Sequence, residues 1–535
     1  MSATVHNQAE EMPWTWEQCA QGWEADPAGG EHDYWLEPKH IEGELPEGLM
    51  GTLLRNGPGS IRVHGQALEH PIDGDGLVAG LTFTGDGRVH YRARFVQSKH
   101  RRVETEAQQM RYRGQMGSLP PHFSRLKATV NAIGTVAFGR RKNPFPFRNP
   151  SNTNVFYWAG KLLAAYETHM PHSLHPTTFE TLGVERFDGA LKRVKTFAAH
   201  FRVDPKTGHL VTLSARPKVG KRPAVLLFSE FDQDWNPIRQ QEHHIEGLNY
   251  VHDFAMTPNY LIVQMTPFVQ VDALVGLKIL SGFSSPGELM RHYPELPSKI
   301  IVIPRYKGAG WVEDQAELNP IHFDDVSPVH VYHFGTATET DEGLELTAVC
   351  LSPPFNMHWD QKVWLSNTNS APGFFCRYAL KWPSNDGEPG RLSRNQIDDC
   401  SCEFPIVDTR YHGQRQRYVY LMANDRPGQN LPYRDIVKCD VVQGGEGRQV
   451  WHSEGLVGEP TFAPGTARST DGDVGLLIVQ LYRPEHNTTQ FVILDAKNVD
   501  AGPVCRLHLP HHVPFSFHTT FCPEPIGIEH SPSQG

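Results

Sequence analysis

Long hydrophobic runs are absent from this sequence. No stretch of its 535 residues approaches the roughly 18 consecutive apolar residues of a membrane-spanning helix. The N-terminal segment MSATVHNQAEEMPWTWEQ is acidic and lacks the apolar centre of a secretory signal. We therefore expect a protein that is soluble or lies on the surface of a membrane.

Large basic tracts and paired cysteines are lacking as well. Fifty lysine and arginine residues stand against sixty acidic ones, the net charge is −10, and no basic segment has the size of a nucleic-acid footprint. The eight cysteines are scattered, and only Cys400 and Cys402 lie close together, without the CxxC spacing of a zinc site. These features exclude nucleic acid as a partner and indicate reduced, structural thiols in a cytoplasmic protein.

Turn-forming residues, in contrast, are abundant, with 42 prolines and 47 glycines. Short apolar or alternating runs lie between them, as in strands joined by turns, at residues 161–167, 260–265, 344–352, 417–422, 475–482 and 490–496. Helical periodicity is sparse, and its best example is residues 124–142. The chain exceeds one ordinary core and contains no evident linker, which favours a single closed β architecture such as a propeller, although no blade repeat is recognisable.

Four histidines stand beside predicted strands, each among apolar or aromatic residues. They are His200 in AAHFRVDPKTG, His252 in VHDFAMTPNY, His333 in VYHFGTATE and His518 in VPFSFHTTF. Their spacing is too long for a local metal loop, but the inner strands of propeller blades converge on one axis, where four such side chains could reach one ion. For any one of them, a core histidine with one satisfied nitrogen is the usual explanation.

Three glutamates lie among small or apolar residues, where a lone carboxylate would be costly to bury. They are Glu167 at the end of LLAAYE, Glu403 in CEFPIVDTR and Glu459 in GEPTFAP. A structural ion pair with lysine or arginine is the usual explanation. The functional alternative is a carboxylate that accepts the N–H of a metal-bound imidazole and so fixes its orientation.

In chain order these segments resemble the carotenoid cleavage oxygenases, from about Asp33 to Phe521. EGELPEGLMGTLLRNGPG, HPIDGDGLV and NPSNTNVFYWAGKLLAAYE are similar to the early part of that family, and the histidine and glutamate segments follow in the family's order. Two positions depart from the common pattern. Thr336 stands where the family usually has Asn after the third histidine, and Thr519 where it usually has Gly after the fourth.

The resemblance implies an all-β fold, a seven-bladed β-propeller with a dome of loops and short helices over an axial metal site. It implies Fe(II) as the cofactor and identifies the expected ligands as His200, His252, His333 and His518. It makes Glu167, Glu403 and Glu459 their outer carboxylate partners and places Thr153 beside an open coordination position. We expect an N-terminal extension over residues 1–30, one oxygenase domain over 31–522 and a tail over 523–535.

The implied activity is the addition of O2 across a double bond of a carotenoid or apocarotenoid, which breaks to give two carbonyl products. EHDYWLE, HPIDGDGLV and NTN are most similar to the apocarotenoid oxygenases that cleave the central 15,15′ bond and release retinal. Cleavage at another bond such as 9,10, cleavage of a stilbene and retinoid isomerisation are alternatives within the family. Outside it, the alternatives are a non-catalytic propeller that binds a carotenoid or a protein, and a zinc hydrolase.

An insoluble polyene substrate would have to be drawn from a membrane. The 124–142 segment places Leu126, Val130, Ile133, Val136 and Phe138 beside the basic residues Arg140, Arg141 and Lys142, as in a helix that lies in a membrane surface. Residues 271–286 are apolar but too short to span. Ordinary core packing is the alternative for both segments. We expect a cytoplasmic protein that associates peripherally with membranes.

Overall fold

The computed structural model describes residues 12–528 apart from a set of short gaps. These gaps are residues 26–29, 139–146, 193–195, 217–223, 246–250, 267–277, 280, 290–295, 309–317, 326–327, 352–371, 385, 427–429, 468 and 470. The basic end of the expected helix, residues 140–142, and most of the 271–286 segment therefore lie outside the described residues.

The short apolar runs of the sequence are strands, as predicted. In chain order they are β9 (Lys161–Ala165), β17 (Tyr260–Met265), β21 (Gly343–Leu351), β25 (Tyr418–Asn424), β30 (Gly475–Arg483) and β31 (Thr488–Asp495). The expected amphipathic helix is α3 (Arg125–Phe138). Within the part of the chain that the structure describes, no helix is both long and apolar enough to cross a membrane.

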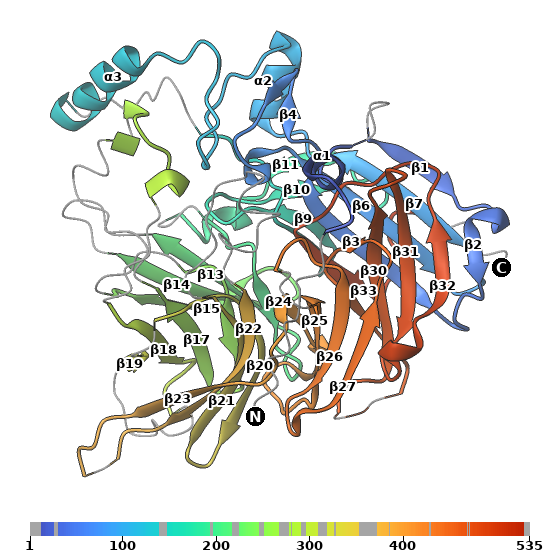
Figure 1. The fold of residues 1–535 in the computed structure, drawn as a ribbon. Coiled ribbons are helices and arrows are strands. Elements are labelled where there is room, and N and C mark those ends of the chain that lie inside the picture. Colours follow the sequence, from blue (N-terminus) through green and yellow to red (C-terminus); the bar gives the residue numbers. More distant parts are fainter. Residues whose placement is uncertain are drawn as a thin grey trace, which may run out of the picture. The chain divides into compact units, whose positions relative to one another are not determined.

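Two compact units make up the chain. The four-sheet unit consists of Trp23–Glu37, Glu47–Pro328 and Val513–Gly535, and the three-sheet unit of Met1–Gly22, Pro38–Pro46 and Val329–His512. Figure 1 shows the sheets of both units coloured along the sequence. The large sheets of both units are antiparallel throughout their described strands.

The four-sheet unit holds four large sheets within its described residues. In hydrogen-bonding order, the first sheet is β1 (His32–Trp35), β7 (Val89–Phe95), β6 (Gly76–Thr84), β3 (Met50–Pro58) and β33 (His518–Cys522). The second sheet is β11 (Thr181–Val184), β10 (His172–Leu174), β9 and β8 (Asn154–Trp158). The third sheet is β12 (Phe201–Val203), β13 (Leu210–Arg216), β14 (Val225–Phe231) and β15 (Pro237–His243), and the fourth is β16 (Phe254–Met256), β17, β18 (Ser298–Pro304) and β19 (Ile321–Asp325). The unit also contains the hairpin β4 (Arg62–Val63) and β5 (Gln66–Ala67), α2 (Lys99–Ala107) and α3.

The three-sheet unit is built in the same way. Its first described sheet is β2 (Ile41–Gly43), β32 (Pro503–His508), β31, β30 and β28 (Leu456–Val457), with β29 (Thr461–Pro464) also paired to β30. The second is β20 (His330–Thr340), β21, β22 (Gly373–Lys381) and β23 (Arg391–Gln396). The third is β24 (Ser401–Ile406), β25, β26 (Asp435–Asp440) and β27 (Gly444–His452). Its helix is α1 (Trp16–Gln21), which begins with a capping box at Thr15. The seven large sheets of the described residues confirm the expected mostly-β, seven-bladed propeller with few helices.

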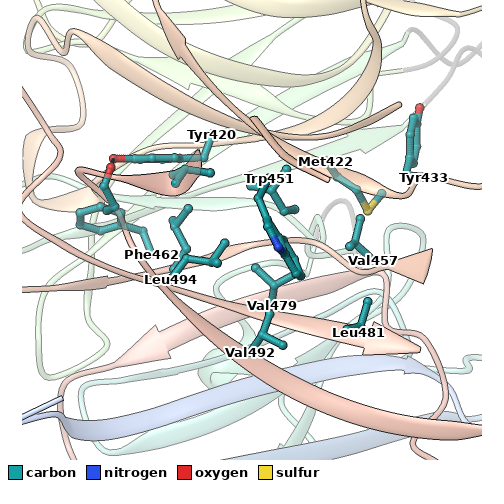
Figure 2. Packing of buried hydrophobic residues seen from close by; sticks show 14 of the residues in the cluster. Tyr420, Met422, Tyr433, Trp451, Val457, Phe462, Val479, Leu481, Val492 and Leu494 are labelled. Atoms are coloured by element: carbon teal, nitrogen blue, oxygen red, sulfur yellow. Dashed lines mark hydrogen bonds between the residues drawn. The ribbon is translucent and has the colours of Figure 1, made fainter. Parts of the chain in front are cut away.

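Apolar packing between neighbouring sheets stabilises the three-sheet unit. Figure 2 shows a cluster in which Tyr420 and Trp451, from β25 and β27, pack against Val479, Val492 and Leu494 of β30 and β31. The Tyr420 hydroxyl donates a 3.0 Å hydrogen bond to the Ala496 carbonyl, so that its only polar atom is satisfied inside the cluster.

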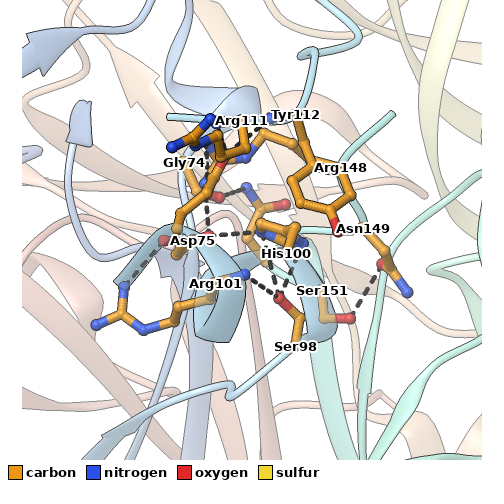
Figure 3. Close-up of polar contacts among 12 residues, drawn as sticks. Gly74, Asp75, Ser98, His100, Arg101, Arg111, Tyr112, Arg148, Asn149 and Ser151 are labelled. Carbon is orange, nitrogen blue, oxygen red and sulfur yellow. Dashed lines mark hydrogen bonds and ion pairs between the residues drawn. The ribbon is translucent and has the colours of Figure 1, made fainter. Parts of the chain in front are cut away.

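A buried network of charges ties α2 to the segment that leads into β8. Asp75 contacts Arg148, His100 and Arg101 at 2.6, 2.7 and 2.9 Å (Figure 3). Burial alone would raise the pKa of Asp75, but these three groups hold it well below its ordinary value. Ser151, in the same segment, lies 2.6 Å from Nδ1 of His172 on β10. The network therefore fixes the backbone immediately before β8.

His172 generates a pH-dependent prediction. Its burial, followed by the effect of His100, lowers its pKa from 6.5 to about 4. Between these values the unfolded chain binds a proton that the folded protein excludes, so stability falls as the pH drops through this window. His172→Gln should reduce the loss between pH 6.5 and 4 by up to about 3 kcal/mol, measured by urea unfolding at each pH.

The matched control is His486→Gln, which replaces an exposed histidine. This variant should keep the pH dependence of the unmodified protein. An unchanged pH dependence in His172→Gln would show that His172 does not titrate on unfolding as expected.

Candidate metal centre

Three of the expected ligands meet in the four-sheet unit. His518 is the first residue of β33, His200 directly precedes β12, and His252 lies two residues before β16. Each of these strands is the terminal strand of its sheet in hydrogen-bonding order. The Nε2 atoms of His200 and His252 are 3.0 Å apart, and the ring centres of His200 and His518 are 4.6 Å apart at 81°. The imidazoles thus converge from three different sheets.

Asparagine side chains link the sheet that carries His518, through β8, to the segment that carries His200. Asn56 is paired with His518 across β3 and β33, and its side chain donates 2.8 Å hydrogen bonds to the carbonyls of Ser151 and Asn154. The Asn154 side chain in turn donates to the carbonyl of Ala199, next to His200, at 2.9 Å. Because all these groups are buried, their loss would leave unpaired carbonyls near the histidines.

His333 belongs to the three-sheet unit and lies inside β20. The β20–β21 ladder is irregular on both sides of Phe334, and such bulges redirect side chains at functional sites. His333 Nδ1 contacts Glu403 Oε2 of β24 at 2.6 Å. Phe404 follows in the left-handed region, with φ 54°, and its ring stacks on His333 with centres 5.0 Å apart. The unfavourable backbone conformation of Phe404 thus places its ring against the imidazole of His333.

Two of the expected outer glutamates lie against the Nδ1 atom of a histidine. Glu167, two residues after β9, contacts Nδ1 of His252, as Glu403 contacts Nδ1 of His333. A carboxylate there retains the proton on Nδ1 and leaves the Nε2 lone pair free for a metal. Glu459 is buried after β28, and Thr153 is buried before β8, where its N–H donates to Ala165. The roles of Glu167, Glu403, Glu459 and Thr153 stay predictions.

The donor set suits a transition-metal ion. Among the described residues, His200, His252, His333 and His518 form a group whose ring nitrogens could hold one metal ion. Neutral imidazoles bind iron, zinc, copper and nickel. With metal–nitrogen bonds of about 2.1 Å, ligands at 90° lie about 3.0 Å apart and tetrahedral ligands about 3.4 Å apart. The 3.0 Å separation of the His200 and His252 nitrogens is short enough for both to bind one ion, and it is also the length of an ordinary hydrogen bond.

Thr336 and Thr519, the two departures from the family pattern, both lie in β-strands and contact a neighbouring strand. The Thr336 N–H donates to Oγ1 of Thr347 at 2.7 Å, and the two threonine hydroxyls are 2.9 Å apart, so Thr336 ties the irregular part of β20 to β21. Thr519 is paired with Arg55 in the β3–β33 ladder.

Sequence reasoning missed Phe404, Asp253 and Arg202. A left-handed phenylalanine leaves no signature in a sequence. The other two had a signal, since an aspartate directly follows one predicted ligand and an arginine follows another by two residues.

Comparison with known proteins identifies the family. The model of the RPE65 family, described as retinal pigment epithelial membrane protein, matches residues 26–523. The chain belongs to the RPE65/carotenoid cleavage oxygenase family. It is 32% identical over 508 residues to apocarotenoid-15,15′-oxygenase of Synechocystis, covering 93% of this chain and 94% of that protein. It is 25% identical over 507 residues to isoeugenol monooxygenase of Pseudomonas nitroreducens, covering 91% and 94%.

Solved structures agree over almost the whole chain. Cobalt-substituted Synechocystis ACO superimposes with a TM-score of 0.81 at 31% identity, covering 96% of this chain and 100% of that one. An ACO/RPE65 chimera gives the same TM-score at 30% identity and the same coverage. The chain is therefore a carotenoid/apocarotenoid cleavage oxygenase family enzyme with a four-histidine metal site.

The contact between Glu403 and His333 can be tested by metal binding. Glu403→Gln keeps the shape of the side chain but removes the charge that holds the proton on Nδ1. We expect metal affinity to fall about 10- to 100-fold, measured by competition with a coloured chelator. Glu342→Gln is the control, because Glu342 is an exposed glutamate paired with Lys381 in the same unit. Equal affinities for both variants would contradict the assigned role.

Proposed function

We propose that this enzyme is an Fe(II)-dependent dioxygenase that cleaves the 15,15′ double bond of apocarotenoids and releases retinal. The observation that carries the proposal is the 32% identity to apocarotenoid-15,15′-oxygenase over nearly the full length of both proteins. Iron is proposed as the metal from the resemblance to the family, and the four-histidine group is able to hold it. We further propose that residues 31–522 act as one oxygenase domain, with residues 1–30 as an extension and 523–535 as a tail.

The proposed iron would supply the site for binding and activating O2. The chain's own residues would present the four imidazoles to the ion, and Glu167, Glu403 and Glu459 are proposed to hold protons on the ring nitrogens that face away from it. Because the imidazoles are neutral, these glutamates provide the negative charge that balances a dipositive ion from a distance. Thr153 is proposed to border the open coordination position.

The chemistry of the substrate follows from the reaction. Both atoms of O2 enter the two products, one carbonyl oxygen on each former alkene carbon, so the double bond supplies the electrons and no separate reductant is consumed. A long conjugated polyene is electron-rich and meets this requirement.

Incubation of iron-loaded protein with apocarotenals of several lengths tests the proposal. Central cleavage should release retinal from every length, identified by chromatography and mass. Products whose size changes with substrate length would place cleavage at another bond, such as 9,10. Turnover of isoeugenol or lignostilbene alone would show that the enzyme acts on the aromatic alkenes for which its other relatives are named.

His333→Ala tests the assignment of the metal ligands. Loss of one ligand should abolish iron retention and cleavage together, read by metal analysis and product formation. An active His333→Ala variant would overturn the metal assignment. Polyene binding without cleavage by the iron-loaded protein would favour the non-catalytic alternative.

Peripheral membrane association of a cytoplasmic enzyme is part of the proposal. Leu126, Val130 and Ile133 of α3 are 76%, 61% and 53% exposed, and their spacing places them on one face of the helix. Phe283 is 53% exposed, and its ring centre lies 5.7 Å from the guanidinium of Arg125, the first residue of α3 (Figure 1). Exposed apolar side chains beside a basic residue suit the surface of an anionic bilayer. The side chains of Val136 and Phe138 lie outside the described residues.

Vesicle sedimentation tests this surface. Replacing Leu126, Val130 and Ile133 with serine should release most of the protein from anionic vesicles, because the apolar area that enters the bilayer is lost. Leu182→Ser is the control, since Leu182 on β11 is 65% exposed. Equal sedimentation of both variants would exclude α3 as the contact.

A further inference from the structure

Asp253 and Arg202 form a buried ion pair beside two of the histidines. Asp253 directly follows His252, and Arg202 follows His200 by two residues. Nη2 of Arg202 donates to both carboxylate oxygens of Asp253, at 2.9 and 2.8 Å, and the two side chains are 14% and 2% exposed. Nη1 donates to the carbonyl of Phe201 at 2.9 Å, which fixes the guanidinium on β12. The pair therefore joins the segments that carry two expected ligands.

The carboxylate of Asp253 faces the outward nitrogen of His200. Oδ1 of Asp253 lies 3.8 Å from Nδ1 of His200, while Nε2 of His200 points to His252. His252 and His333 turn the corresponding nitrogen to Glu167 and Glu403. Asp253 thus occupies, for His200, the place that a glutamate occupies for those two histidines. At 3.8 Å the interaction is electrostatic and longer than a hydrogen bond.

The arginine makes this carboxylate different from the glutamates. Its positive charge compensates Asp253, so the pair orients the imidazole dipole of His200 without adding a full negative charge to the site. The guanidinium also lies over the ring of Phe254, 5.3 Å from its centre, which restricts its movement.

We propose that Asp253, held by Arg202, is a positioning residue for His200 that keeps its Nε2 directed at the metal position. This inference rests on the proposed metal function. The pair acts on two ligands together, because it fixes the spacing of the β12 and β16 segments as well as the ring of His200. No step of the reaction involves Asp253 directly.

Cobalt binding to the metal-free protein tests the proposal through a readout other than activity. Co²⁺ is titrated into the protein, its dissociation constant is measured, and its visible absorption spectrum reports the ligand geometry. Asp253→Asn should weaken binding about 10- to 100-fold and change the spectrum, because His200 is no longer oriented. Asp253→Glu keeps the charge and extends the carboxylate toward Nδ1, so it should restore affinity to within a few-fold of the unmodified protein.

Glu230→Gln is the matched control, since Glu230 is a buried carboxylate of the same unit that accepts a 2.9 Å hydrogen bond from Arg239. It should bind Co²⁺ with unchanged affinity and spectrum. All measurements are made below the unfolding temperature of each metal-free variant. If Asp253→Asn fails to fold, Arg202→Lys retains the positive charge without the bridging geometry and should weaken Co²⁺ binding about 3- to 10-fold with a changed spectrum.

The possible outcomes distinguish the positioning role of Asp253 from the proposed metal function. Unchanged affinity and spectrum in Asp253→Asn, or in Arg202→Lys where that variant replaces it, would overturn the positioning role while the metal site stands. Equal losses in the Asn and Glu variants would also overturn it, because only packing would then matter. Failure of the unmodified protein to bind Co²⁺ would overturn the proposed metal function and this inference with it.

Discussion

Two imidazole nitrogens held 3.0 Å apart impose a demand that the surrounding structure has to meet. At that distance the two nitrogens can share a proton in a hydrogen bond, but where both lone pairs are free they repel one another unless a cation attracts both. The protein holds each ring by placing its residue just before a strand and by a contact between a carboxylate and its other nitrogen. The contacts of Glu167 with His252, of Glu403 with His333 and of Asp253 with His200 restrict the rotation of these rings.

The strands deliver these groups in a consistent way. His200, His252 and His518 each lie at or just before the terminal strand of a sheet, where the backbone leaves the regular ladder and side chains can be redirected. His333 is inside a longer strand, and there the ladder itself becomes irregular and Phe404 adopts an unfavourable conformation. Regular β structure provides rigidity, and local departures from it provide direction.

Much of this architecture could be predicted from the sequence. The run 260–265 coincides with β17, because a buried strand between turn residues leaves a continuous apolar signal. The convergence of His200, His252 and His518 could be expected only through the resemblance, since no local spacing relates them. Other features have no sequence signal, among them the left-handed Phe404 and the hydrogen bonds of Thr336. The exposure of Leu126 and Val130 was also open, because helical periodicity shows a face without showing what covers it.

The pairing of β3 with β33 has a consequence for how the chain reaches its native state. Residues 50–58 and 518–522 are neighbours in one sheet, although nearly the whole sequence separates them. During synthesis β3 and β6 can pair early, but the open side of β3 has no partner until β33 has been made. An unpaired strand edge of this kind can capture other chains, and contacts between distant segments form slowly. The open edge of β3 is therefore available to other chains for the whole interval between its own synthesis and that of β33.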